Sequence, residues 1–255
     1  MKSTGQPSDI GKNRTGIQMS PKQAKAMEEG SSRVQPPPGD ESKIAEVREG
    51  YHARATPVGT MAPPGTLKGM AKSAGKALTG HKATVLLDKM GERMAFERTG
   101  VRLYDALIAK VSASGEVDSI GLTEAALRKI QTDELRHMQI VAEAIEEMGA
   151  DPTSETPCAD VAGVQALGVM QVLTDPRTTV SQGLAAILTA ELVDNASWEM
   201  LVDLAREFGN DELANTFDEA RRQEEEHLRQ VKGWIEGLTK QESLGVSAPA
   251  APPPA

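Results

Sequence analysis

Four segments of this chain follow the hydrophobic period of long amphipathic helices, and each has acidic residues in the middle of its apolar stripe. In two segments the stripe contains the motif Glu-x-x-His, at Glu134–His137 and Glu224–His227. In the other two it contains a glutamate that stands alone, Glu97 or Glu191. Residues three and four apart lie on one face of a helix, so helices that bury their stripes against one another bring these polar groups together. A helical bundle with a polar layer in its core satisfies this pattern.

Common start and stop signals bound the expected helices. They span about residues 82–111, 122–148, 179–208 and 211–237. Gly149 and Gly209 end the second and third helices, and Gly237 ends the fourth. Asn210 or Asp211 caps the start of the fourth.

A long connection separates the second and third helices. It has some 30 residues, and within it we predict a short helix from Asp160 to Leu173. A link of that length can run the full height of a bundle, because a 28-residue helix is about 42 Å long. We therefore predict an all-α fold, a four-helix bundle with a long crossover between helices two and three.

Residues 1–80 differ from the rest in composition. They are rich in Pro, Gly, Ser and Lys and bury too little apolar surface to offset their ordering entropy, so we expect a mostly disordered arm. Two short helices are predicted within it, at about Glu41–Ala53 and Thr66–Leu78; they dock on the bundle, stay loose, or bind a membrane surface or a partner. The chain then divides into this arm, a bundle over residues 81–240 and a Pro/Ala-rich tail over residues 241–255.

The formal net charge of −9 is unevenly distributed. Residues 1–80 hold 12 Lys and Arg against 7 Asp and Glu, which leaves 16 against 30 in residues 81–255. An acidic bundle is a poor partner for nucleic acid and suits the binding of cations.

The one cysteine, Cys158, excludes an internal disulfide framework and multi-cysteine metal modules. No stretch is apolar enough for a transmembrane segment and the N-terminus lacks the apolar region of a secretory signal, so we expect a cytoplasmic protein.

Carboxylates that face one another in an apolar core are costly, because each is desolvated and each repels the others. Divalent cations remove both costs. In Glu-x-x-His the two side chains are neighbours on one helical face and can ligate the same ion. Oxygen and nitrogen donors without thiolate suit iron, with manganese or zinc as alternatives. The predicted metal ligands are Glu97, Glu134, His137, Glu191, Glu224 and His227.

Two further residues are expected beside the metal ions and are candidate catalytic groups. Asp194 follows Glu191 by about one turn and is interpreted as an extra ligand or base, or as a group that orients a histidine. Tyr104 follows Glu97 by two turns. It is either a core tyrosine with a satisfied hydroxyl or a redox-active group.

The ordered motifs and the crossover resemble the ferritin-like di-iron carboxylate superfamily over about residues 82–238. The run Asp133-Glu134-Leu135-Arg136-His137 is also similar to the D-E-x-R-H form of di-iron oxygenases. That similarity implies that Asp133 and Arg136 support the ligands from outside the metal site. The second copy begins with Gln223 and departs from this form, which counts against an oxygenase.

This resemblance also implies roles for the individual residues. The implied arrangement has two bridging glutamates and one Glu–His pair for each ion: Glu134 and Glu224 bridge, Glu97 pairs with His137, and Glu191 pairs with His227. Tyr104 matches a tyrosine that lies near the iron site in bacterioferritin-like proteins. Leu135 stands where bacterioferritins carry the methionine that binds haem, so two iron ions and no haem are expected.

Oxidation of Fe(II) by O2 or hydrogen peroxide, in iron handling or peroxide defence, is the function that the resemblance implies. Two other classes stay open. One is a di-iron or di-manganese enzyme that acts on an organic substrate or dismutates peroxide, with access past small residues such as Gly100 and Ala220. The other is a structural or stress-associated bundle whose metal is incidental. We expect a homo-oligomer, with a dimer as one option.

Overall fold

A computed structural model describes residues 21–33, 41–59, 61, 83–115 and 117–245 of the chain. Within these ranges the regular structure is helical, and the one β feature is an isolated bridge between Val117 and Leu122. The predicted all-α class is therefore confirmed for the described residues. The chain divides into two units, Met1–Thr56 and Pro57–Ala255.

The first unit contains two helices, α1 (Pro21–Ser31) and α2 (Glu41–Arg54). The prediction at Glu41–Ala53 matches α2. Composition assigned α1 to the disordered arm, but its Ala, Lys, Gln, Met and Glu residues favour helix and its proline occupies the first turn, where no backbone donor is needed. The predicted helix at Thr66–Leu78 lies outside the described residues, as does the tail from residue 246.

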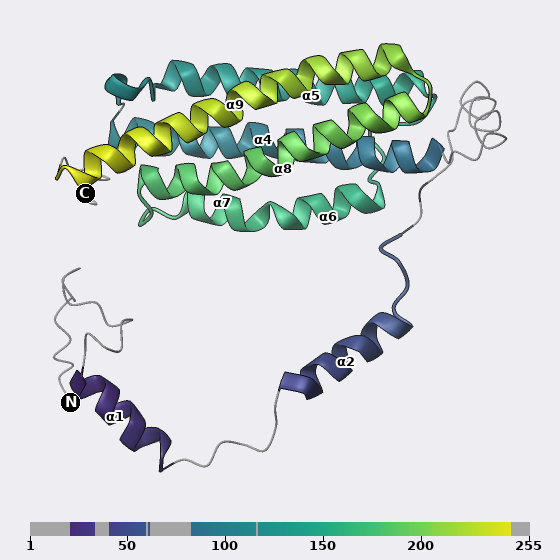
Figure 1. The fold of residues 1–255 in the computed structure, drawn as a ribbon. Coiled ribbons are helices and arrows are strands. Elements are labelled where there is room, and N and C mark those ends of the chain that lie inside the picture. Colours follow the sequence, from purple (N-terminus) through teal and green to yellow (C-terminus); the bar gives the residue numbers. More distant parts are fainter. Residues whose placement is uncertain (1–20, 34–40, 60, 62–82, 116, 246–255) are drawn as a thin grey trace. The chain divides into compact units, whose positions relative to one another are not determined.

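Four long helices make up most of the second unit: α4 (Ala83–Ser114), α5 (Glu124–Glu147), α8 (Val180–Glu207) and α9 (Asp211–Ser243). α4 packs against α5 and α8, and α9 packs against α8 and α5 (Figure 1). Side chains cap the starts of three of them: Thr123 accepts a hydrogen bond at α5, Thr179 at α8 and Asn210 at α9. These caps satisfy backbone N–H groups that a helix leaves without a partner.

The fourth helix is longer than predicted. Gly237 does not end α9, which continues to Ser243 and is followed by Gly245 at φ 77°. The glycine serves packing instead, because a methyl group at its position would overlap the side chain of Ile120 in η3 (Asp118–Ile120). Leu238, the next residue, is fully buried, so tertiary packing outweighs the low helix propensity of glycine.

Two short helices fill the connection between α5 and α8. α6 (Pro157–Gln165) and α7 (Leu167–Thr174) replace the single helix predicted at Asp160–Leu173. The start lies earlier than predicted because Thr156 caps α6 and Pro157 occupies its first turn. α6 runs along α4, and α7 contacts α4 and α8 (Figure 1).

The core of the second unit consists of two apolar clusters with a polar layer between them. The first cluster includes Leu86, Met90, Val141, Trp198 and Phe217. The second includes Leu107, Ile130, Ile187, Val231 and Trp234. Along each long helix the buried residues change from one cluster to the other through the polar positions. The helical period therefore stacks three layers along the helix axes.

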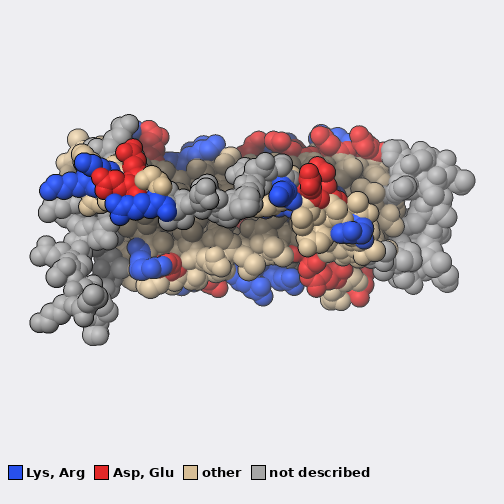
Figure 2. Space-filling view, turned by 90° about the horizontal axis from the view of Figure 1, so that it is seen from below, with Lys and Arg blue, Asp and Glu red and all other residues tan. Residues whose placement is uncertain are grey.

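Figure 2 shows acidic and basic side chains interspersed over the face that it presents. Among those residues, no helix is both long enough and apolar enough to cross a membrane.

Candidate metal centre

The polar layer contains every side chain that the sequence assigned to the site. It also contains one residue that the sequence analysis did not single out, Arg93 on α4. All members of the layer are no more than 3% exposed: Arg93, Glu97, Tyr104, Glu134, His137, Glu191, Asp194, Glu224 and His227. Such burial is unusual for ionisable groups unless they are paired or bind a metal.

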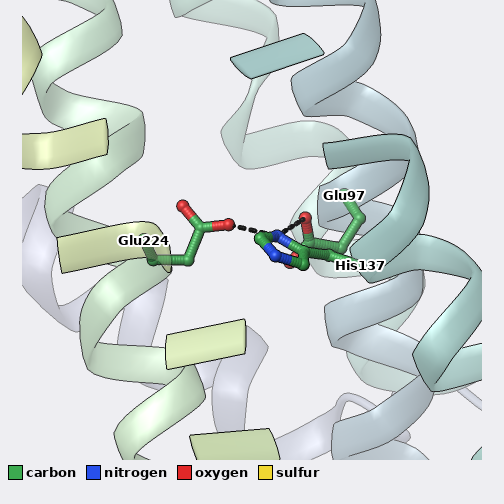
Figure 3. Close-up of side chains that lie close together, drawn as sticks. All are labelled: Glu97, His137 and Glu224. Carbon is green, nitrogen blue, oxygen red and sulfur yellow. Dashed lines mark ion pairs between the residues drawn. The ribbon is translucent and has the colours of Figure 1, made fainter. Parts of the chain in front are cut away.

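Glu97, His137 and Glu224 form the first candidate group of ligands. One ligand atom from each lies within 4.8 Å of the others. His137 Nδ1 is 2.5 Å from Glu224 Oε1 and 3.9 Å from Glu97 Oε2. Figure 3 shows the carboxylates of Glu224 and Glu97, from different helices, both directed toward the His137 ring. The three donors thus converge from α4, α5 and α9.

Glu134, Glu224 and His227 form the second group, again with ligand atoms within 4.8 Å of one another. His227 Nδ1 lies 3.1 Å from Glu224 Oε2 and 3.5 Å from Glu134 Oε1. Glu224 therefore belongs to both groups and directs one carboxylate oxygen toward each histidine. A carboxylate in that position is suited to bridge two ions.

Arg93 supplies a positive charge beside the first group. Its Nε is 2.8 Å from Glu97 Oε1, and its Nη1 is 2.8 Å from Asp194 Oδ1. The guanidinium also lies 4.2 Å from the centre of the Phe96 ring, a cation–π contact. The signal for this residue was present in the sequence, since Arg93 precedes Glu97 by four residues on the same stripe.

Asp194 thus lies against Arg93, and among the described residues no hydrogen bond or ion pair joins its carboxylate to a histidine. Its carboxylate is also part of a third candidate group of ligand atoms within 4.8 Å, together with Glu97, Glu134 and Glu224. The structure is therefore compatible with the prediction of an extra ligand. It gives no support to the alternative that Asp194 orients a histidine.

Glu191 lies outside these three groups. Tyr104 donates a short hydrogen bond to Glu191 Oε1, so the tyrosine hydroxyl is satisfied. Asn195 connects two helices at the same level: its Nδ2 donates to the carbonyl oxygens of Glu191, at 2.9 Å, and of Glu224, at 3.1 Å. A metal role for Glu191 and a redox role for Tyr104 stay predictions.

Each histidine has a second polar partner on its other nitrogen. His137 Nε2 is 2.8 Å from Gln223 Oε1, and His227 Nε2 is 3.2 Å from Asp133 Oδ2. Each Nδ1 is therefore left to face the carboxylates. Arg136, which the resemblance also implied as a supporting residue, is exposed on α5.

Burial controls the protonation of most carboxyl groups in the layer. Desolvation raises the pKa of Glu97, Glu191 and Asp194 well above the usual carboxyl values, and the neighbouring carboxylates add to the shift. Desolvation, with the charge of Glu224, also raises the pKa of Glu134. These groups therefore tend to hold protons, which a bound cation would displace.

Glu224 behaves in the opposite way. Burial alone would raise its pKa, but hydrogen bonds with His137 and His227 lower it to about 2. Burial alone would lower the pKa of His227, but its contacts with Asp133, Glu134 and Glu224 raise it. Glu224 is therefore an anion held between two imidazole rings at neutral pH.

Several buried oxygens in the layer lack a hydrogen-bond partner within the part of the chain that the structure describes. They include Oε2 of Glu97, Oε1 of Glu134 and Oε2 of Glu191. An unsatisfied buried acceptor costs about 1–3 kcal/mol. Because the oxygens of Glu97 and Glu134 belong to oxygen-and-nitrogen donor groups that converge on common points, these groups fit a pair of divalent transition-metal ions.

The space beside Gly100 is filled by the carboxylate of Glu134. A methyl group at Gly100 would overlap Oε2 of Glu134, so the glycine allows that carboxylate to lie against the backbone of α4. The sequence analysis considered Gly100 and Ala220 as a route for substrate. At Gly100 that prediction is wrong, because the Glu134 carboxylate occupies the space beside the glycine. Ala220 is buried in the first apolar cluster.

No protein-family model matches the chain, and neither curated proteins nor solved structures gave a match. The likeness to ferritin-like proteins therefore rests on the motifs and on the geometry of the polar layer.

Proposed function

We propose that this chain is a ferritin-like four-helix bundle with a dinuclear iron site that oxidises Fe(II) with O2 or hydrogen peroxide. The observation that carries the proposal is the pair of buried ligand groups that share Glu224. Each group contains one histidine and two carboxylates, and both lie in a layer closed by apolar clusters at either end.

The residues have distinct roles in this proposal. Glu97 and His137 hold one ion, and Glu134 and His227 the other, with Glu224 between them. Glu134 is a second bridge by resemblance. Glu191, by resemblance a terminal ligand, accepts the Tyr104 hydrogen bond at Oε1, while its Oε2 has no hydrogen-bond partner among the described residues.

Iron bound there would supply the redox chemistry: two Fe(II) ions give two electrons, which with two protons reduce one hydrogen peroxide to two waters or one O2 to hydrogen peroxide. The protein contributes charge and exclusion of water. Carboxylates stabilise the higher charge of the oxidised metal, and the apolar shell limits access of water and other reactants. Arg93 stays protonated and lies against Asp194.

A structural role is the second candidate, and the Arg93 contacts favour it. Two of the buried carboxylates already have a cationic partner without any metal. Buried ion pairs of this kind occur as structural features in proteins. In that case metal binding would be incidental.

Oxidation of Fe(II) without an added organic substrate distinguishes these functions. Purified metal-free protein would be loaded anaerobically with two Fe(II) per chain and then mixed with limiting hydrogen peroxide or O2. We expect about two Fe(II) oxidised per peroxide consumed, at a rate far above that of free Fe(II). An unchanged rate would contradict the proposal and leave the structural role.

A further inference from the structure

The two Glu-x-x-His motifs support each other's histidines. The residue just before each motif contacts the histidine of the other motif: Asp133 contacts His227, and Gln223 contacts His137. Both contacts are made by Nε2, and in both cases Nδ1 faces the shared carboxylate of Glu224. The two halves of the layer are thus alike in geometry.

The two halves of the layer differ in charge. The partner of His227 is a carboxylate, whereas the partner of His137 is the neutral amide of Gln223. An imidazole that donates its outer N–H to a carboxylate becomes a more basic ligand through its other nitrogen. The Asp133 side chain is held in place by Lys129, whose Nζ lies 2.9 Å from Oδ2. Because Lys129 is exposed, this ion pair weakens the charge of Asp133 only modestly.

The two groups also differ in the charge that lies beside their glutamates. Glu97 Oε1 is 2.8 Å from Arg93 Nε and accepts a hydrogen bond of 2.8 Å from Trp198 Nε1. A metal ion bound by the other oxygen of Glu97, Oε2, would therefore still lie close to a buried cation. Among the described residues, no lysine or arginine forms an ion pair with Glu134 in the second group, whose Oε1 lies 3.5 Å from His227 Nδ1.

From these differences we infer that the two metal positions are inequivalent: the position at His227 binds its ion first and more tightly, and Asp133 and Gln223 set the difference. This inference rests on the proposed dinuclear site. Asp133 and Gln223 are positioning residues, because they act through the histidines. Changes in such outer partners alter metal affinity by about 10–100-fold.

The test is a titration of the metal-free full-length chain with Co(II), followed by visible absorption and by calorimetry. We expect two equivalents in two phases, with affinities that differ by about 10-fold or more. His227→Ala should remove the tight phase, and His137→Ala the weak one. Circular dichroism would show that each variant keeps its helices.

Two nearly isosteric substitutions separate the inference from a general effect on packing. Asp133→Asn should weaken the tight phase by about 10-fold or more and leave the weak phase unchanged. Gln223→Glu should strengthen the weak phase instead, and the double variant should reverse the order of filling. A structural role alone would move both phases together.

The outcomes also separate this inference from the proposed function. Two equal phases, or equal shifts of both phases in Asp133→Asn, would overturn the inequivalence while the dinuclear site stands. Binding of fewer than two equivalents to the unaltered chain would overturn both.

Discussion

The two apolar clusters and the polar layer between them are built by the same four helices, yet they meet opposite physical demands. In the clusters, side chains such as Leu107 and Phe217 gain stability simply by leaving water. In the layer, burial is unfavourable for almost every side chain, and it raises the pKa of Glu97, Glu191 and Asp194. The clusters explain why the helices associate, and the layer requires a different reason.

The layer is therefore not an optimum for the stability of the metal-free chain. Apolar residues of similar volume at buried ionic positions are often neutral or stabilising. A chain under selection for stability alone has little reason to keep five buried carboxyl groups at one level of its core. Metal binding supplies a reason, because cations restore the interactions that the carboxylates lose on leaving water.

The largest effect is expected from Glu224→Ala, which removes the one ligand common to both groups. Iron content after anaerobic loading should fall from about two per chain to nearly zero, since each remaining group keeps only two of its donors. Glu225→Ala is the matched control, because Glu225 is exposed and pairs with Arg221 on the surface. It should leave the metal content unchanged; loss of metal in both variants would contradict the assigned ligands.

Leu107→Ala perturbs the second apolar cluster rather than the layer. Leu107 is fully buried, so the cavity should lower the free energy of unfolding by about 2–5 kcal/mol. Chemical denaturation of the metal-free protein measures this. The metal stoichiometry should persist, and its loss at unchanged helicity would mean that the clusters and the layer are not separable in the way described.

Gly100→Ala and Gly233→Ala form a matched pair within α4 and α9. The first methyl group collides with the Glu134 carboxylate and should destabilise the fold by about 1–3 kcal/mol, as overpacking does. The second points into open space on an exposed turn and should stabilise α9 by about 0.5–1 kcal/mol. Calorimetric melting of both variants tests this; changes of the same sign would show that Gly100 does not make room for a ligand.

The mildest perturbation is pH. A carboxyl group whose pKa is raised in the folded state holds protons that the unfolded chain has lost, so its contribution to stability disappears as pH rises through the folded pKa. Glu97, Glu191 and Asp194 all have this sign. His227 has the same sign, because its pKa is also raised. Glu224, with a pKa of about 2, is ionised in both the folded and the unfolded chain above the ordinary carboxyl range. Its contribution to stability therefore does not change with pH there.

The melting temperature of the metal-free chain should therefore fall as the pH rises above about 5, the upper end of the ordinary carboxyl range. Two divalent ions per chain should remove much of this dependence, because the bound carboxylates are then ionised throughout. The same slope with and without metal would indicate that the ions bind elsewhere.

Helical periodicity was sufficient to predict the four glutamates of the layer. Glu97, Glu134, Glu191 and Glu224 recur at the centres of apolar stripes, and the structure buries all four. Thr179 and Asn210 illustrate how local caps set helix starts close to the predicted ones. Such features depend on residues close in sequence, which is why they could be predicted.

Contacts between distant segments could not be predicted in the same way. Arg93 was missed because an arginine at a stripe position is usually exposed, and one of its buried partners, Asp194, approaches from a different helix, α8. The end of α9 was placed too early because Ile120, far away in sequence, fills the space at Gly237. The cross-pairing of Asp133 with His227 likewise depends on how α5 and α9 face one another.

The central claim is that the polar layer holds two metal ions in each chain. The most direct measurement is the iron content per chain by elemental analysis, after anaerobic loading with Fe(II) and desalting. The account predicts about two iron ions per chain. A content near zero would contradict it and would leave the buried carboxylates of the layer as a structural feature held by Arg93 and the two histidines.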